Sequence, residues 1–321
     1  MLADVPGIKI SHRISPRPTE EELSFFEQLG IEYATIWTGV EDANEPYLVW
    51  VRDLLAARGI RVWNVGILDL HCDPTLTLGL PGWEEKMEQY LAYLEALGRA
   101  GIGYTTYAHM ANIKMLPYYQ TGMSPTRGGV MTREFDEALA ADLPPSHGRT
   151  YSDDEIWATL TRFLEHAVPA AERAGVRIGL HPDDPPLPSL GGVARVIRDE
   201  DGYRRALEIA GSENFGLCFC VGTWAEGGDR TGKSVLDMIR DYGDCIYKVH
   251  FRNVDAPMPV FRETFVDNGY LNMYEVLKAL RAVEFEGALL PDHVPGGLIH
   301  TAYTIGYMKA MRDRVNAEWG C

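Results

Sequence analysis

The chain has 321 residues, 46% of them hydrophobic, so it is long enough to bury one large core. Asp and Glu total 46 against 30 Lys and Arg, and the formal charge of -16 would repel nucleic acid and anionic lipid. The composition therefore argues against both kinds of partner.

The chain carries none of the usual signals for export. Its opening, MLADVPGIKI, lacks the basic and apolar regions of a signal peptide, and no run approaches the roughly 20 apolar residues that span a membrane. An odd number of scattered cysteines does not suit a disulfide framework, so we expect reduced thiols and a soluble, cytoplasmic protein. The five are Cys72, Cys218, Cys220, Cys245 and Cys321.

Short β-rich runs alternate with longer amphipathic runs along the chain. The first run, GIKIS (7–11), precedes a helix predicted at 19–30, where Thr19 and Glu22 have the spacing of a capping box. Further strands are predicted at 31–37, 61–66, 104–109, 177–181, 216–222, 246–253 and 287–293. The helices that follow them are predicted at 43–58, 82–101, 152–174, 193–210, 231–241, 272–285 and 300–318.

Eight strand-then-helix units are typical of a (β/α)8 TIM barrel, because parallel neighbours need crossover helices. We therefore predict an α/β fold with one barrel domain over residues 1–321. The alternative is an open doubly wound sheet, but no predicted strand is followed by a G-x-G-x-x-G turn, so a dinucleotide site is not supported.

One connection, residues 110–150, is much longer than the usual link between a barrel strand and its helix. It follows the C-terminal end of the fourth strand, so we expect it over the face where barrel active sites are built. It is interpreted as a lid or substrate loop; an oligomer contact or a plain insertion is the alternative. Whether the chain forms a homo-oligomer stays open.

Four metal-binding residue types stand at four successive strand ends. They are His181, Cys220, His250 and Asp292, at the ends of the fifth to eighth predicted strands. Imidazole, thiolate and carboxylate groups bind divalent transition metals, and positions would remain open for substrate. Each residue alone is more often structural, but their common position predicts a metal site.

Cys218 and Cys220 lie two apart in one predicted strand, so their side chains share a face. Cys220 is nearer the C-terminal rim, whereas Cys218 lies one layer deeper. We therefore interpret Cys220 as the metal ligand and Cys218 as a small core residue.

Further polar residues are expected near the same rim. Cationic and amide groups there suit an anionic, polyhydroxylated substrate, because an arginine can hold a carboxylate through two hydrogen bonds. Arg252 could instead pair with a neighbouring acid. The candidate substrate-binding residues are Arg13, Trp37, His109, Asp183, Arg252 and Asn253.

Several motifs between residues 175 and 310 resemble the mannonate dehydratase family: LHPDDPP, CVGT, KVHFRNV, FRETFVDNGYLNMYEVLKAL, and PDH followed by GYMKA. The resemblance implies a xylose-isomerase-like TIM barrel that binds Mn²⁺ and converts D-mannonate, in hexuronate catabolism, to 2-keto-3-deoxy-D-gluconate. It also implies that the metal ligands are the four strand-end residues.

Dehydration needs a base that takes the proton next to the carboxylate and an acid that protonates the leaving hydroxyl. In the family a tyrosine shortly after the strand-8 Asp-His pair is implicated in catalysis, and Tyr307 has a similar setting. Tyr307 and His293 are therefore the catalytic candidates. For Tyr307, simple packing on the last helix is the alternative.

Departures from the family keep other functions open. The chain is shorter than the typical member, and its N-terminal half matches the usual family opening poorly. Asn272 stands where the family normally has Asp, and Val266 where it often has His. A metal-dependent isomerase or epimerase of a sugar or sugar acid, and a sugar-acid binding protein without catalysis, are the alternatives. The metal is also open, because a thiolate by itself favours softer ions such as Zn²⁺. We expect Mn²⁺ first, with Zn²⁺, Co²⁺ or Fe²⁺ as alternatives.

Overall fold

A parallel sheet of eight strands forms the centre of the computed structural model, which describes residues 7–113 and 115–319 and so leaves Cys321 outside. In sheet order the strands are β3 (Arg61–Ile67), β2 (Tyr33–Thr38), β1 (Lys9–Ile14), β14 (Ala288–Pro291), β11 (Ile246–Phe251), β10 (Phe215–Cys220), β7 (Arg177–Leu180) and β4 (Tyr104–Tyr107). Thr105 Oγ1 in β4 donates to the Val65 carbonyl in β3 at 3.1 Å, so the two ends of this order meet. The predicted TIM barrel is confirmed.

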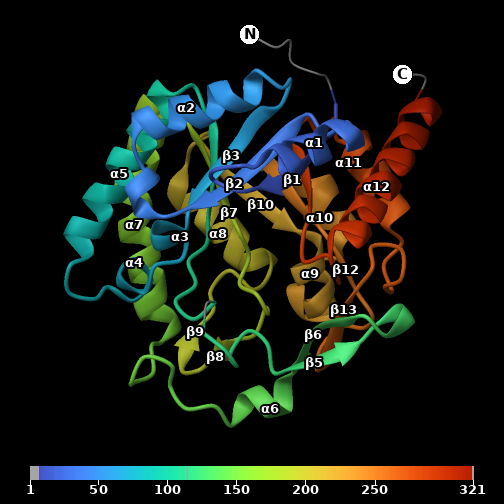
Figure 1. Ribbon diagram of the computed structural model, residues 1–321. Helices are drawn as coiled ribbons and strands as arrows, with labels where there is room; N and C mark the ends of the chain where they lie inside the picture. Colours follow the sequence, from blue (N-terminus) through green and yellow to red (C-terminus); the bar gives the residue numbers. More distant parts are fainter. Residues whose placement is uncertain (1–6, 114, 320–321) are drawn as a thin grey trace.

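Helices surround the barrel, as Figure 1 shows, with α2, α5 and α7 on one side and α10, α11 and α12 on the other. The capping box predicted at Thr19 and Glu22 is present, because each side chain bonds the backbone of the other. The main helices are α1 (Glu20–Leu29), α2 (Glu45–Ala56), α5 (Trp83–Arg99), α7 (Asp153–Ala174), α8 (Glu200–Ala210), α10 (Val235–Tyr242), α11 (Met273–Ala282) and α12 (Leu298–Glu318), with the short α3 (Leu68–His71) and α4 (Pro74–Leu78) after β3.

Several predicted boundaries were wrong, and two of them lie close to the candidate site. The helix predicted at 193–210 begins only at Glu200, because residues Val193–Ala194 form β9, which pairs antiparallel with β8 (Ser189–Leu190). The strand predicted at 216–222 ends at Cys220, where α9 (Val221–Gly227) begins. The Cys220 sulfur caps this helix by accepting from the Thr223 amide at 3.4 Å, so the candidate ligand sits at a strand-to-helix junction.

The long connection after β4 is more ordered than a loop. It contains the hairpin β5 (Gly122–Pro125) and β6 (Met131–Asp136), followed by α6 (Glu137–Ala141). Strand β6 pairs antiparallel with β13 (Val260–Thr264). Strand β13 also pairs antiparallel with β12 (Asn253–Val254), which follows β11 in the chain. The four strands make a second sheet beyond the C-terminal end of the barrel, at the bottom of Figure 1.

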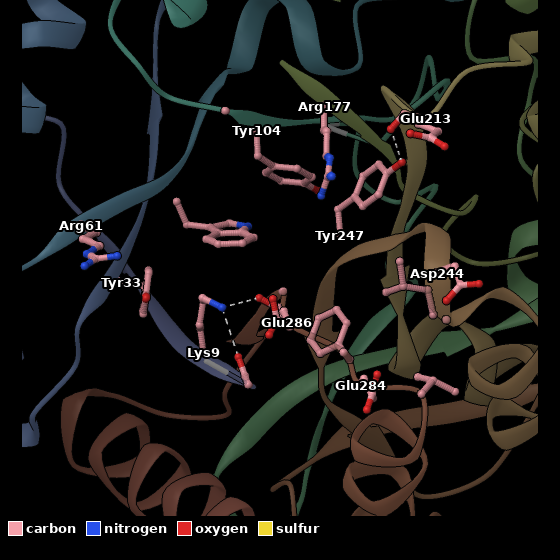
Figure 2. Close-up of a pocket in the computed structure, with 18 of the residues that line it drawn as sticks. Lys9, Tyr33, Arg61, Tyr104, Arg177, Glu213, Asp244, Tyr247, Glu284 and Glu286 are labelled. Atoms are coloured by element: carbon pink, nitrogen blue, oxygen red, sulfur yellow. Dashed lines mark hydrogen bonds between the residues drawn. The ribbon is translucent and has the colours of Figure 1, made fainter. Parts of the chain in front are cut away.

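A cavity of about 1230 Å³ opens at the other, N-terminal end of the barrel. Figure 2 shows Tyr104, Arg177 and Tyr247 on one side of it, and Lys9 on the other, bonding the carbonyls of Gly7 and Glu286. None of the candidate metal ligands lines this cavity, which agrees with active sites at the C-terminal end of barrels. Within the described residues, no helix is long and apolar enough to cross a membrane.

Candidate metal centre

Three predicted ligands meet at the C-terminal end of the barrel. His181 directly follows β7, Cys220 ends β10, and His250 lies in β11 as the register neighbour of Cys220. One ligand atom from each lies within 4.8 Å of the others, and all three residues are buried. His181 Nε2 is 3.2 Å from His250 Nδ1. The structure therefore brings together the three side chains that the strand-end pattern predicted as ligands on these adjacent strands.

Asp292, the fourth predicted ligand, adjoins this cluster. Its Oδ2 lies 3.5 Å from His250 Nδ1 and 3.4 Å from Arg252 Nε, and its Oδ1 lies 3.5 Å from Arg13 Nη2. The carboxylate thus touches one ligand directly and is surrounded by cationic groups.

The donor set suits a divalent transition metal. His250 Nε2 is buried, and no described residue bonds it, as expected of an atom available to an ion. Burial lowers the pKa of His181 to about 4 and that of His250 well below its usual value. Burial also raises the pKa of the Cys220 thiol to about 12. Burial by itself would raise the pKa of Asp292, but the neighbouring imidazoles of His293 and His250 hold it below its usual range.

These pKa shifts predict the proton balance of metal binding. At pH 7 both imidazoles are neutral and the carboxylate is ionised, so only Cys220 must lose a proton. We expect release of about one proton per ion bound, and apparent affinity that rises about tenfold per pH unit below the thiol pKa. Calorimetry in buffers of different ionisation enthalpy measures this release. Binding without proton release would show that the thiol is not a ligand.

Arg252 lies among carboxylates instead of facing open space. Its Nη2 is 2.7 Å from Asp184, and its Nη1 is 2.5 Å from Glu226. Arg133, from β6, lies 2.6 Å from Asp184 and 3.1 Å from Glu263. All five side chains are buried, so the alternative interpretation of Arg252, pairing with acids, describes its place in the structure.

Three other substrate candidates already have protein partners. The Asn253 amide donates to two carbonyls and accepts from two backbone amides, including those of Leu271. His109 bonds Tyr107 and a threonine of α7, and Asp183 accepts from the Ile197 amide at 2.7 Å. These three side chains are bonded to the protein around the site, and their contact with substrate stays a prediction.

Arg13 and Trp37 remain open to a ligand. The Arg13 side chain is 52% exposed, although it is close to Asp292. The Trp37 ring meets His71 edge-on at 4.5 Å, and its Nε1 is buried without a partner among the described residues. Both residues stand on the β1–β2 side of the barrel.

The two catalytic candidates have different surroundings. His293 Nδ1 lies 2.6 Å from Glu263 Oε1, and its Nε2 lies 3.8 Å from Asp292 Oδ2. Against partial burial, these carboxylates raise the pKa of His293. Tyr307 lies on α12, half-buried, with its ring stacked on Tyr303 at 6.2 Å. No described contact joins Tyr307 to the ligand cluster, whereas His293 adjoins it through Asp292.

The sequence argument missed several charged residues of the site. Arg133 lies in the connection that was treated as a loop, and Glu226 lies in α9, which was expected to be partly strand. Lys248 could have been found, because it alternates with His250 in KVH and so shares its face of β11.

Comparisons with known proteins were made for the whole chain. The family model for D-mannonate dehydratase matches residues 137–317. The mannonate dehydratase of Oceanobacillus iheyensis is 25% identical over 280 residues, which cover 76% of this chain and 77% of that protein. The crystal structure of mannonate dehydratase from Streptococcus suis serotype 2 superposes with a TM-score of 0.87 at 23% identity, covering 98% of this chain and 95% of that one. A xylose isomerase domain protein from Planctomyces limnophilus gives 0.66 at 11% identity, covering 97% and 99%.

Proposed function

The chain belongs to the mannonate dehydratase family, and on that premise we propose that it is a metal-dependent hydro-lyase that converts D-mannonate to 2-keto-3-deoxy-D-gluconate. The observation that carries the proposal is the buried cluster of His181, Cys220 and His250 at three adjacent strand ends, with the Asp292 carboxylate beside it. These four residues would hold the ion.

The proposed chemistry divides between the ion and the side chains around it. A bound divalent ion supplies Lewis-acid stabilisation of negative charge on substrate oxygens. The carboxylates of Asp292 and Glu263 raise the pKa of His293, which favours its protonated form, and its side chain is 35% exposed and so accessible to a substrate. His293 is therefore our candidate acid for the leaving hydroxyl. Tyr307 is the candidate for the second proton transfer.

The departures from the family are compatible with this function. Asn272 caps α11 by accepting from the Tyr274 amide at 3.1 Å, and asparagine and aspartate are equally good N-caps. Val266 is buried in the core, and its carbonyl accepts from the Asn253 amide. No described contact joins either side chain to the metal cluster.

We propose Mn²⁺ as the first candidate for the ion, with Zn²⁺, Co²⁺ and Fe²⁺ behind it. The carboxylate of Asp292 suits Mn²⁺, whereas the thiolate of Cys220 favours the softer ions. We also propose a cytoplasmic location, since Cys218 and Cys220 are free thiols, which such a compartment keeps reduced.

Incubation of the metal-loaded protein with D-mannonate tests the proposed function. We expect a 2-keto-3-deoxy acid to accumulate, which is measured through a colour reaction of its new keto group. No product should form after the metal is removed. Absence of product with Mn²⁺, Co²⁺ and Zn²⁺ would rule the function out. Exchange of solvent deuterium into the substrate without loss of water would indicate an isomerase or epimerase instead.

The role of Tyr307 can be tested by changing it to phenylalanine. We expect Tyr307→Phe to lower turnover about 100-fold, with metal content and Tm unchanged, because only a proton-transferring hydroxyl is lost. Tyr303→Phe is the matched control, since its ring stacks on Tyr307 from the same helix. A loss of stability with full activity would assign Tyr307 to packing.

A further inference from the structure

Lys248 is a buried lysine whose ammonium group has no hydrogen-bond acceptor among the described residues. It lies in β11, two residues before His250 and on the same face, and it is fully buried. No described residue bonds its Nζ. An ammonium group without a hydrogen-bond acceptor in a protein interior costs folding free energy, so its retention calls for an explanation outside core packing.

Other unpartnered polar atoms lie on the opposite wall of the barrel. Lys248 Nζ is 5.9 Å from the centre of the Trp37 ring, whose Nε1 has no described partner. Thr35 Oγ1, in the same strand, and Asn64 Nδ2, in the neighbouring one, are buried and unpartnered too. Three of these four groups are donors only, and a hydroxyl can donate, so together they match a ligand rich in oxygen acceptors.

Contacts around the barrel join these residues into one layer beneath the metal ligands. The Thr106 hydroxyl donates to Asn64 Oδ1 at 3.4 Å and lies 3.9 Å from Cys218 Sγ. Cys218 is in turn the register neighbour of Lys248. Arg13, the register neighbour of Thr35, extends the layer to the Asp292 carboxylate at 3.5 Å. Lys248 thus lies two residues below His250 in β11, and the other donors lie across the barrel in β2 and β3.

Arg252, the other buried cation beside the cluster, is already neutralised. Asp184, Glu226 and Asp292 all lie within 3.4 Å of its guanidinium, and Glu263 lies at 3.5 Å. A substrate anion placed there would meet carboxylates. Lys248 therefore offers an ammonium group to which no described carboxylate is bonded, as an anionic substrate needs.

We propose that Lys248, with Trp37 Nε1 and Asn64 Nδ2, binds the carboxylate of the sugar-acid substrate. The inference rests on the proposed function and adds to it the residues that select an acid over a neutral sugar. A carboxylate accepts hydrogen bonds from all three groups, and the ammonium also opposes the charge that develops on its oxygens when the neighbouring proton leaves.

Ligand discrimination tests this inference without requiring turnover. Binding of D-mannonate and of D-mannitol, which has hydroxyls but no carboxylate, is measured by calorimetry in metal-loaded His293→Asn protein. We expect Lys248→Met to weaken the binding of D-mannonate about 100-fold and to leave the affinity for D-mannitol unchanged. Lys278→Met is the control, because Lys278 pairs with Glu275 on the outer helix α11 and should change neither.

Thermal stability gives a second measurement. Because Lys248→Met removes an unpaired buried charge, Tm without ligand should rise by about 3 °C. Trp37→Phe keeps an aromatic ring but removes the indole N–H donor, and should weaken the binding of D-mannonate about 10-fold. A lower Tm, together with an equal loss of affinity for both ligands, would show that Lys248 is a structural residue and would overturn the inference.

The outcomes separate this inference from the proposed function. If D-mannonate binds in a Lys248-dependent manner but no product forms, the carboxylate site stands and the dehydratase assignment fails. If the wild-type protein forms product but Lys248→Met binds D-mannonate as tightly as the parent, the assignment stands and the carboxylate site is refuted. No preference for D-mannonate in the parent protein would refute it as well.

Discussion

Cys220→Ala should leave the protein folded but largely unable to retain its metal ion. Changes to residues that only support a ligand cost about 10- to 100-fold in affinity, so loss of a ligand should cost at least about 100-fold. We expect metal content to fall from about one ion per chain to below a tenth after dialysis, and turnover to fall about 1000-fold. Elemental analysis and the product assay measure the two losses.

Cys218→Ala is the matched control, because this thiol lies in the same strand and on the same face. Cys218 is fully buried one layer deeper, and the Thr106 hydroxyl is 3.9 Å from its sulfur. The change should cost about 1 kcal/mol of stability and leave metal content intact. Equal metal loss from both variants would contradict the assignment of Cys220. In Co²⁺-loaded protein, the thiolate absorption band should disappear only in Cys220→Ala.

The barrel was predictable because its signals are local and repeat. Hydrophobic runs of strand length followed by amphipathic helices recur eight times, several helices begin at capping residues such as Thr19, and each unit constrains the next. The ligands were predictable for the same reason. Once parallel strands are assumed, the ends of neighbouring strands must lie together, so His181, Cys220 and His250 converge without knowledge of any distance.

The unpredicted features depend on pairing across long sequence separations. Strand β6 is stabilised by pairing with β13, more than 100 residues away, and the hairpin segment has no strong period of its own. The same pairing brings Arg133 to Asp184 and Glu263. Sequence patterns predict which residues lie at a strand end, but they do not reveal whether Arg252 binds substrate or four neighbouring acids.

Arg133→Met should produce the largest loss of stability of any change discussed here. Arg133 is 5% exposed, and Asp184, Glu226 and Glu263 lie within 3.5 Å of its guanidinium. Without Arg133, three buried carboxylates share one remaining arginine. Removing one partner from a buried ion pair costs about 3–5 kcal/mol, which corresponds to roughly 10 °C in Tm for a chain of this size. Calorimetry or urea unfolding measures the change.

Arg127→Met, in the turn of the same hairpin, provides the control. Arg127 pairs with Asp267 at 2.7 Å, but its side chain is 45% exposed, and such surface pairs contribute at most about 1 kcal/mol. Adding Glu226→Gln to Arg133→Met should restore part of the stability, because it removes one uncompensated charge. If Arg133→Met loses no more stability than Arg127→Met, the buried network does not stabilise the packing of the hairpin on the barrel. If only Arg133→Met is unstable, burial of the unpaired carboxylates accounts for the loss of stability. Strand β6, which carries Arg133, is then as much a part of the site as the barrel strands.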